Sequence, residues 1–179
     1  MSIVGVTEET GARESTVGVS SLLRALASNS ERLHTAVFRQ QYAALCFRLV
    51  DKENEVQVLV ITSRDTGRWV IPKGWPMKRK KPHEAAAIEA LQEAGVRGKP
   101  SKKPIGQYTY MKRLDSGVDV PCIVDVFKVE ISASEAEYKE KGQRTLEWVS
   151  PAEASRRVQE PELKSLLASF RRMPRKRSA

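Results

Sequence analysis

Three polar side chains share one face of a short, alanine-rich segment. His83–Ala94 contains neither proline nor glycine, a proline precedes it and a glycine follows it, so the pattern predicts a helix. In that helix Glu89, Gln92 and Glu93 lie at i, i+3 and i+4 and project from the same face. Two carboxylates at this spacing repel each other slightly, and a divalent cation bound between them would reverse that repulsion. Alone, the spacing fits a solvated charged face as well as a metal site.

A basic loop precedes the predicted helix. Lys73–Pro82 contains one glycine, two prolines and five basic residues. Lysine and arginine attract a polyphosphate anion, while a metal held by neighbouring carboxylates would neutralise its oxygens. Loop and helix together therefore predict metal-assisted phosphate chemistry. The structural alternative is a run of charge on a solvated surface.

Composition restricts the class of protein. A chain of 179 residues, 40% apolar or aromatic, fits one domain of ordinary size. Its net charge of +9 favours anionic partners such as a nucleotide, a polyphosphate or a nucleic acid. We expect no association with a membrane, since no apolar run approaches the length of a membrane span and no secretory signal pattern is seen. Cys46 and Cys122 lie far apart in apolar stretches, which is typical of small buried residues in a reducing cytoplasm.

The apolar pattern predicts a sheet flanked by helices. The expected strands are Tyr42–Val50, Glu55–Thr62, Arg68–Ile71, Ile105–Lys112, Val118–Ile131 and Thr145–Val149. A basic loop is expected at Gly98–Pro104 and a charged connector at Glu135–Gln143. Two closing helices are expected at Pro151–Val158 and Pro161–Met173. Strands with one internal helix and terminal helices indicate an α+β fold, arranged as an α/β/α sandwich.

The chain divides into three regions. Residues 1–36 are rich in Ser, Thr, Gly and Glu, and we expect a flexible leader with a candidate short helix at Ser21–Ser28. Residues 37–170 form the predicted folded domain. Residues 171–179 are expected to form an unstructured basic tail.

The loop and helix, GWPMKRKKPHEAAAIEALQEAGV, resemble the Nudix box. That pattern is Gly, five residues, Glu, seven residues, then Arg-Glu-apolar-x-Glu-Glu-x-Gly-apolar. Gly74 and Gly95 match its glycines, and Glu89 and Glu93 match the first and last glutamates of its helix. The stretches VLVITSRDTGRWVIPKG and RTLEWVSPAEA are similar to the diphosphoinositol polyphosphate phosphohydrolases within that family. The resemblance covers residues 40–170 and implies a mixed β-sheet of Nudix type flanked by helices.

Three positions depart from the box. This chain has Lys80 at the position of the loop glutamate and Ile88 at the position of the arginine. It has Gln92 at the position of the middle glutamate of the helix. In the family the arginine helps to orient the glutamates, and Ile88 has no group that donates a hydrogen bond. Gln92 keeps a carbonyl oxygen that can ligate a metal, but it is uncharged and cannot act as a general base. These departures predict a weaker or differently organised site.

The resemblance implies a Mg²⁺- or Mn²⁺-dependent hydrolase that cleaves a phosphoanhydride bond. Glu89 and Glu93, with a backbone carbonyl near Gly74, are expected to hold the metal, and Gln92 completes the expected catalytic set. The expected substrate-binding residues are Arg39, Arg64, Lys73, Lys78, Arg79 and Arg144. Diphosphoinositol polyphosphates and dinucleoside polyphosphates are the preferred substrates. Among the tryptophans, Trp75 is the exposed candidate for stacking on a base.

Two alternative functions stay open. The basic loop and tail also suit an enzyme that removes 5′ phosphates from RNA, because they would grip the nucleic-acid backbone. Lys80, Ile88 and Gln92 also suit a non-catalytic Nudix module that binds a polyphosphate without hydrolysing it. A cytoplasmic monomer or homodimer is expected in each case.

Overall fold

The fold is a sheet between helices, seen in a computed structural model that describes residues 38–50 and 55–171. The predicted leader with its short helix, and all of the predicted basic tail except Arg171, lie outside these residues. The helices are α3 (Pro82–Ala94), α4 (Pro151–Arg157) and α5 (Pro161–Ser169). The strands are β1 (Arg39–Val50), β2 (Glu55–Thr62), β3 (Trp69–Val70), β4 (Lys73–Gly74), β5 (Val96–Pro100), β6 (Gly106–Arg113), β7 (Asp119–Ser134) and β8 (Leu146–Val149).

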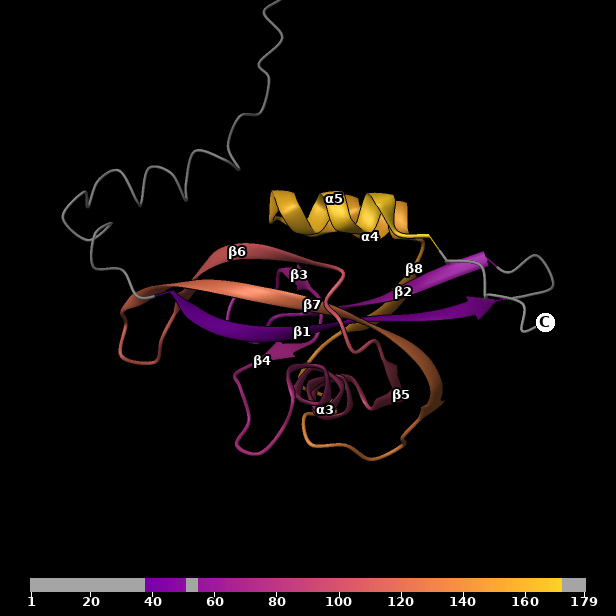
Figure 1. Cartoon of the computed structure of the whole chain (residues 1–179), viewed down its shortest axis with the longest axis horizontal. Coiled ribbons are helices and arrows are strands. Elements are labelled where there is room, and N and C mark those ends of the chain that lie inside the picture. The colour runs from indigo at the N-terminus through magenta and orange to yellow at the C-terminus, as the bar shows by residue number, and fades with distance from the viewer. Residues whose placement is uncertain (1–37, 51–54, 172–179) are drawn as a thin grey trace, which may run out of the picture.

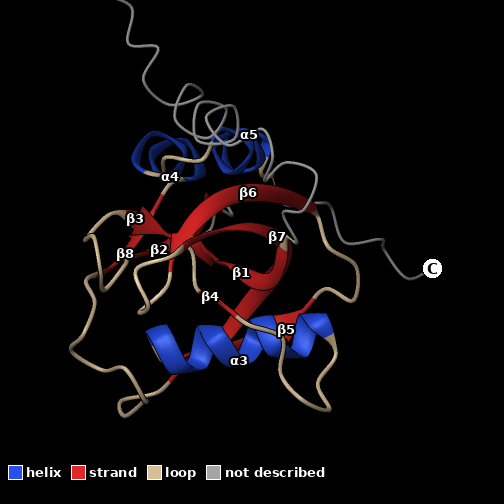
Figure 2. Cartoon of the chain, turned by 90° about the vertical axis from the view of Figure 1, so that its left-hand side faces the viewer, coloured by secondary structure: helices blue, strands red, loops and turns tan. Residues whose placement is uncertain are grey.

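Three layers are seen edge-on in Figures 1 and 2, with α3 on one face of the sheet and α4 and α5 on the other. The α/β/α sandwich expected from the sequence is therefore confirmed. No helix among the described residues has the length and apolar character needed to span a membrane.

The sheet is mixed because its two long central strands, β1 and β7, run parallel while every other pair is antiparallel. Its strand order is β3-β2-β1-β7-β5, with β4 on β1, β6 on β7 and β8 on β2. Along its length β1 pairs first with β4 and then with β2, so one strand connects the short β4 to the rest of the sheet. Tyr42 of β1 lies opposite Gly74 of β4.

A hydrophobic core covers each face of the sheet. On one face Ala86, Ala90 and Ala94 of α3 pack against strand residues such as Leu59 and Phe127. On the other face Leu163 and Leu167 of α5 join Ala154 of α4 and further strand residues. The free thiols of Cys46 and Cys122 are buried, one in each core, as expected for small apolar residues.

Local sequence signals set both ends of α3. Pro82 occupies its first turn, and the Glu84 carboxylate accepts a hydrogen bond of 2.9 Å from the backbone N–H of Lys81. Gly95 ends the helix in the left-handed region, with φ 65°, and its N–H donates to the carbonyl of Leu91. The alanines between these ends let the helix approach the sheet closely.

Three predicted segments differ from the structure. The predicted loop Lys73–Pro82 begins with the short strand β4, which pairs with Tyr42 and Ala43 of β1. The expected basic loop at Gly98–Pro104 begins with a strand, because β5 pairs antiparallel with the long β7 through a register shift at Arg97 and Gly98. The expected closing helix at Pro161–Met173 ends earlier, at Ser169, where Phe170 turns extended and packs its ring against Phe47. In each case a contact distant in sequence decides the boundary.

Candidate active site

The short strand β4 brings its backbone against two glutamates of α3. A Cβ atom placed on Gly74 would lie 2.0 Å from Oε1 of Glu89, so the Glu89 carboxylate packs directly against the glycine. One turn further along α3, Oε2 of Glu93 accepts a hydrogen bond of 3.0 Å from the backbone N–H of Lys73. The glutamates that the helical spacing places on one face therefore both reach β4.

Glu93 is also bound from another direction, by Arg144. Nη2 of Arg144 donates to Oε1 of Glu93, its Nε donates to Oε2 of Glu140 at 2.9 Å, and its Nη1 donates to the carbonyl of Thr62 at 2.9 Å. The side chain of Arg144 is only 6% exposed. Each part of its guanidinium is thus engaged by the protein.

Gln92 faces the connector between β7 and β8, which passes beside α3 (orange in Figure 1). Its side-chain oxygen lies 3.4 Å from the ammonium of Lys139, and its backbone carbonyl accepts a hydrogen bond of 3.0 Å from the N–H of Glu140. The structure therefore places Gln92 next to the two glutamates but engages it with the connector.

Burial and like charge act on the two glutamates. Burial, followed by the negative charges of Glu93 and Glu140, raises the pKa of Glu89 to about 7. Burial also raises the pKa of Glu93, which is 8% exposed, and the positive charge of Arg144 partly offsets that rise. The site therefore concentrates carboxylates whose ionised forms are disfavoured until a cation joins them.

The donor set fits a hard divalent cation. Glu89 and Glu93 offer carboxylate oxygens beside the backbone of Gly74, and Mg²⁺ is usually held by one or two carboxylates together with water and substrate phosphate. Within residues 38–50 and 55–171, no three His, Cys, Asp or Glu side chains gather into a metal site by themselves. A metal here would depend on these two carboxylates, a backbone carbonyl and oxygens from the substrate.

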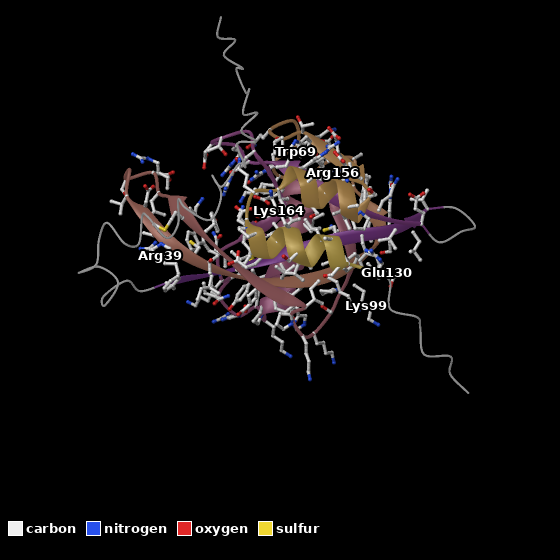
Figure 3. The ribbon with its side chains drawn as sticks, turned by 90° about the horizontal axis from the view of Figure 1, so that it is seen from above. Arg39, Trp69, Lys99, Glu130, Arg156 and Lys164 are labelled. Carbon is white, nitrogen blue, oxygen red and sulfur yellow. The ribbon has the colours of Figure 1, made fainter. Side chains whose placement is uncertain are left out.

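Four of the expected substrate-binding residues stay accessible. Lys78 and Arg79 are exposed in the loop before α3, where Arg79 has a φ of 61°. Arg64 is 53% exposed and lies 3.4 Å from a carboxylate oxygen of Glu140. Arg39 is exposed at the start of β1, at the opposite end of the sheet from Lys99 and Glu130 (Figure 3).

Two expected substrate-binding residues are engaged inside the protein. The ammonium of Lys73 lies 5.3 Å from the ring centre of Tyr110, and burial lowers the pKa of this lysine to about 8. Arg144 is buried against Glu93 and Glu140. Arg144 therefore contacts Glu93, whereas the ammonium of Lys73 lies against Tyr110, which belongs to the core on the α4 and α5 face of the sheet.

The three tryptophans divide between packing and exposure. Trp69 and Trp148 pack against the two cores, and the guanidinium carbons of Arg157 and Arg48 lie 5.0 and 4.4 Å from their ring centres. Trp75, directly after Gly74, is 36% exposed, and the guanidinium carbon of Arg39 lies 5.9 Å from its ring centre. Its indole is therefore exposed beside Arg39, directly after β4.

Sequence reasoning missed the role of the connector. Glu140 and Arg144 are spaced i, i+4, which is a common ion-pair spacing, but nothing in the local sequence places the pair against Glu93. One feature of the sequence does indicate a cation from elsewhere in the chain. Position 88 holds isoleucine in place of the box arginine, which leaves the glutamates without a nearby cation on their own helix.

Proteins with similar sequences include a Nudix hydrolase and diphosphoinositol polyphosphate phosphohydrolases. Nudix hydrolase 13, mitochondrial, from Arabidopsis thaliana is 31% identical over 130 residues, covering 69% of this chain and 64% of that protein. Human diphosphoinositol polyphosphate phosphohydrolase 3-alpha is 44% identical over 62 residues, covering 35% of this chain and 37% of that protein. The matches thus span less than two thirds of the length of these relatives.

Solved structures share the fold at low sequence identity. The Ap4A hydrolase of C. elegans superposes with a TM-score of 0.52 at 15% identity, covering 74% of this chain and 95% of that one. A NUDIX hydrolase from Nitrosomonas europaea gives a TM-score of 0.56 at 16% identity, covering 74% of this chain and 87% of that one. The NUDIX domain family matches residues 39–170, which is most of the chain and includes both glutamates and the loop before them. The protein therefore belongs to the Nudix hydrolase family.

Proposed function

We propose that this protein is a Mg²⁺- or Mn²⁺-dependent hydrolase that cleaves a phosphoanhydride bond in a polyphosphorylated substrate. The observation that carries the proposal is the meeting of Glu89 and Glu93 at the backbone of β4, directly after which the chain enters a basic loop. This arrangement places carboxylate ligands for a cation beside positive charges suited to phosphate. Family membership supports the same reaction class.

We assign metal binding and phosphate binding to different residues of the chain. Glu89 and Glu93 would hold the cation, together with the backbone carbonyl of Gly74. A bound Mg²⁺ or Mn²⁺ supplies Lewis acidity toward the phosphate oxygens. Lys78 and Arg79 neutralise the polyphosphate from the exposed loop, with Arg64 contributing from the side of the connector.

The backbone of Arg79 supports a binding role for the loop. Among the described residues it is the one non-glycine residue with positive φ, at 61°. A side chain in this region costs about 1–2 kcal/mol relative to ordinary backbone, and such strain tends to be found at functional sites. The loop therefore holds an arginine in a conformation that glycine or asparagine would adopt more easily.

For the substrate we propose a diphosphoinositol polyphosphate or a dinucleoside polyphosphate. The diphosphoinositol polyphosphate phosphohydrolases among the relatives favour the first, and the fold of the C. elegans Ap4A hydrolase is compatible with the second. Trp75 and Arg39 supply a flat surface and a cation, features that suit a nucleobase with its phosphates.

One rival function has a specific observation in its favour. Gln92, at the position of the middle glutamate in the box, lies against Lys139 rather than completing a third carboxylate. A site with two carboxylates is compatible with a module that binds a polyphosphate and does not hydrolyse it.

The test measures phosphate release by the full chain with Mg²⁺ or Mn²⁺. The substrates are a diphosphoinositol polyphosphate, diadenosine polyphosphates and a triphosphate-ended RNA, and the proteins are the wild type and Gln92→Glu. We expect the wild type to turn over one of the first two classes. Turnover of the RNA in preference to both would replace the proposed substrate.

The same experiment separates the enzyme from the binding module. No product from the wild type with any substrate and either metal, combined with activity in Gln92→Glu, would establish the binding module. Glu162→Gln serves as the matched control, because Glu162 is exposed on α5 and lies outside the site. Its release rate should equal that of the wild type.

A further inference from the structure

The Nudix box of this chain lacks the arginine of the family pattern, and the structure supplies a guanidinium from another element. Ile88 occupies the box position on α3. Arg144 lies just before β8, 51 residues after Glu93 in sequence, and its Nη2 donates to the Glu93 carboxylate. A cation from the far end of the connector thus contacts the glutamate that the helix leaves without one.

The geometry of Arg144 is fixed from three sides. Glu140 accepts from Nε at 2.9 Å, the Thr62 carbonyl of β2 accepts from Nη1 at 2.9 Å, and Glu93 accepts from Nη2. A planar guanidinium held at three points cannot rotate without losing one of them. The position of the Glu93 carboxylate is therefore tied both to β2 and to the connector.

We propose that Arg144 is a positioning residue that orients Glu93 for metal binding and so replaces the missing box arginine. The inference rests on the proposed function to the extent that Glu93 is a metal ligand. Groups that hold a metal ligand in place usually contribute about 10- to 100-fold to metal affinity or activity. Arg144 acts through Glu93 and does not contact the substrate phosphates.

The sequence resemblance implies a different role for Arg144, in which it binds substrate. The structure argues against that role, because the side chain is 6% exposed and each of its three guanidinium nitrogens donates to Glu93, Glu140 or Thr62. The neighbouring Arg64, 53% exposed and near the same Glu140, is better placed to meet a substrate.

The experiment measures Mn²⁺ binding to the full chain without substrate, from the electron paramagnetic resonance signal of free Mn²⁺. The proteins are the wild type, Arg144→Met, Arg144→Lys and Arg97→Met. Arg97→Met is the matched control, since exposed Arg97 pairs with Glu135 at the other end of the connector. We expect Arg144→Met to bind Mn²⁺ about 10- to 100-fold more weakly, Arg144→Lys to lose less affinity, and the control to match the wild type.

Folding is followed by circular dichroism at the temperature of the binding measurement, because removal of one partner from a buried ion pair is destabilising. If Arg144→Met does not fold, Arg144→Lys decides the question, since its single ammonium cannot contact all three acceptors at once. Weaker Mn²⁺ binding by this folded variant supports positioning.

Two results would overturn the inference, and they have different consequences. Equal or tighter Mn²⁺ binding by the folded Arg144 variants would mean that the arginine only offsets charge, and the proposed metal site would stand. No Mn²⁺ binding by the wild type would remove the metal site itself, and the positioning role together with it.

Discussion

Glu89 and Glu93 differ in what surrounds their carboxylates. Glu93 has two donors, the N–H of Lys73 and the guanidinium of Arg144. Glu89 lies against the Cα of Gly74, and burial is the largest cause of its raised pKa. A carboxylate in this setting gains more from an arriving cation than one that is already paired, because its charge is not yet compensated.

This difference predicts how the stability of the metal-free protein depends on pH. The pKa of Glu89 is about 7 in the folded protein and 4.5 as the reference value. Between these values the unfolded chain releases the proton that the folded protein keeps, so the free energy of unfolding falls as pH rises through this window. Urea denaturation in a chelator at about pH 5 and pH 8 measures the fall. Glu89→Gln should reduce it, and Glu162→Gln should not.

An equal pH dependence in Glu89→Gln and the wild type would contradict this account of the burial of Glu89. Saturating Mn²⁺ at about pH 8 should restore stability to the wild type, because a ligand that binds only the folded state raises its free energy of unfolding.

The exposed side chain of Trp75 predicts that one substitution changes KM for one class of substrate and not for the other. Its exposed indole beside Arg39 can stack on an adenine, and loss of stacking on one base costs about 1–3 kcal/mol. Trp75→Ala should therefore raise KM for a diadenosine polyphosphate by about tenfold and leave KM for a diphosphoinositol polyphosphate unchanged. Val118→Ala, which changes an exposed apolar residue in the turn between β6 and β7, is the control. The same loss with both substrates would exclude base stacking.

At the scale of elements, the site is formed where β4 meets α3. The sequence predicts α3 from Pro82, Gly95 and the lack of breakers between them, and it places the glutamates on one face. It predicts β4 only as loop, because a strand of two residues carries no periodic pattern. Pairing with Tyr42 and Ala43 of β1 creates that strand, and this contact is distant in sequence.

The contact between Gly74 and Glu89 predicts the effect of one added methyl group. In Gly74→Ala the new Cβ would lie 2.0 Å from Oε1 of Glu89, so the carboxylate must move. We expect phosphate release to fall about 10- to 100-fold, with the melting temperature little changed because Glu89 is a side-chain neighbour that can shift. Rates from the phosphate assay and melting by circular dichroism measure the two effects.

Gly117→Ala is the control, in which we expect stability to change and the rate of phosphate release to stay the same. Gly117 lies in the turn between β6 and β7 with φ 78°, where a side chain is strained, and a Cβ added there would lie 3.8 Å from Nη2 of Arg113. This variant should lose stability and keep its rate. Full activity in Gly74→Ala would show that the position of the Glu89 carboxylate is unimportant.

For the whole molecule, the sequence predicts the layers better than it predicts the site. Alternating and apolar strands, one internal helix and two closing helices are enough for the sandwich. The pairing of Arg144 with Glu93 depends on how the connector crosses α3, through contacts such as Tyr138 against Gly95. Such contacts follow from the assembled fold and have no local sequence signal.

The net charge of +9 predicts a salt effect if RNA is bound. Four contacts from Lys78, Arg79, Lys80 and Lys81 to a single strand would give a slope of about −3 for the logarithm of affinity against that of salt concentration. Fluorescence anisotropy with a triphosphate-ended RNA measures this slope. Lys80→Gln should make it shallower by about 0.7, while Lys164→Gln on α5 (Figure 3) should leave it unchanged. Affinity that is insensitive to salt would exclude this mode of RNA binding.

Phosphate release by Glu93→Gln tests most directly whether Glu93 holds the catalytic metal. The substitution keeps the size of the side chain and removes the charge that would hold the cation. With Mg²⁺ and the best substrate of the wild type, we predict a fall in kcat of at least about a hundredfold, since a catalytic metal supplies several kcal/mol of transition-state stabilisation. The circular dichroism spectrum should match that of the wild type. Full turnover by the folded variant would contradict the assignment of Glu93 to the metal site and, with it, the mechanism proposed for this protein.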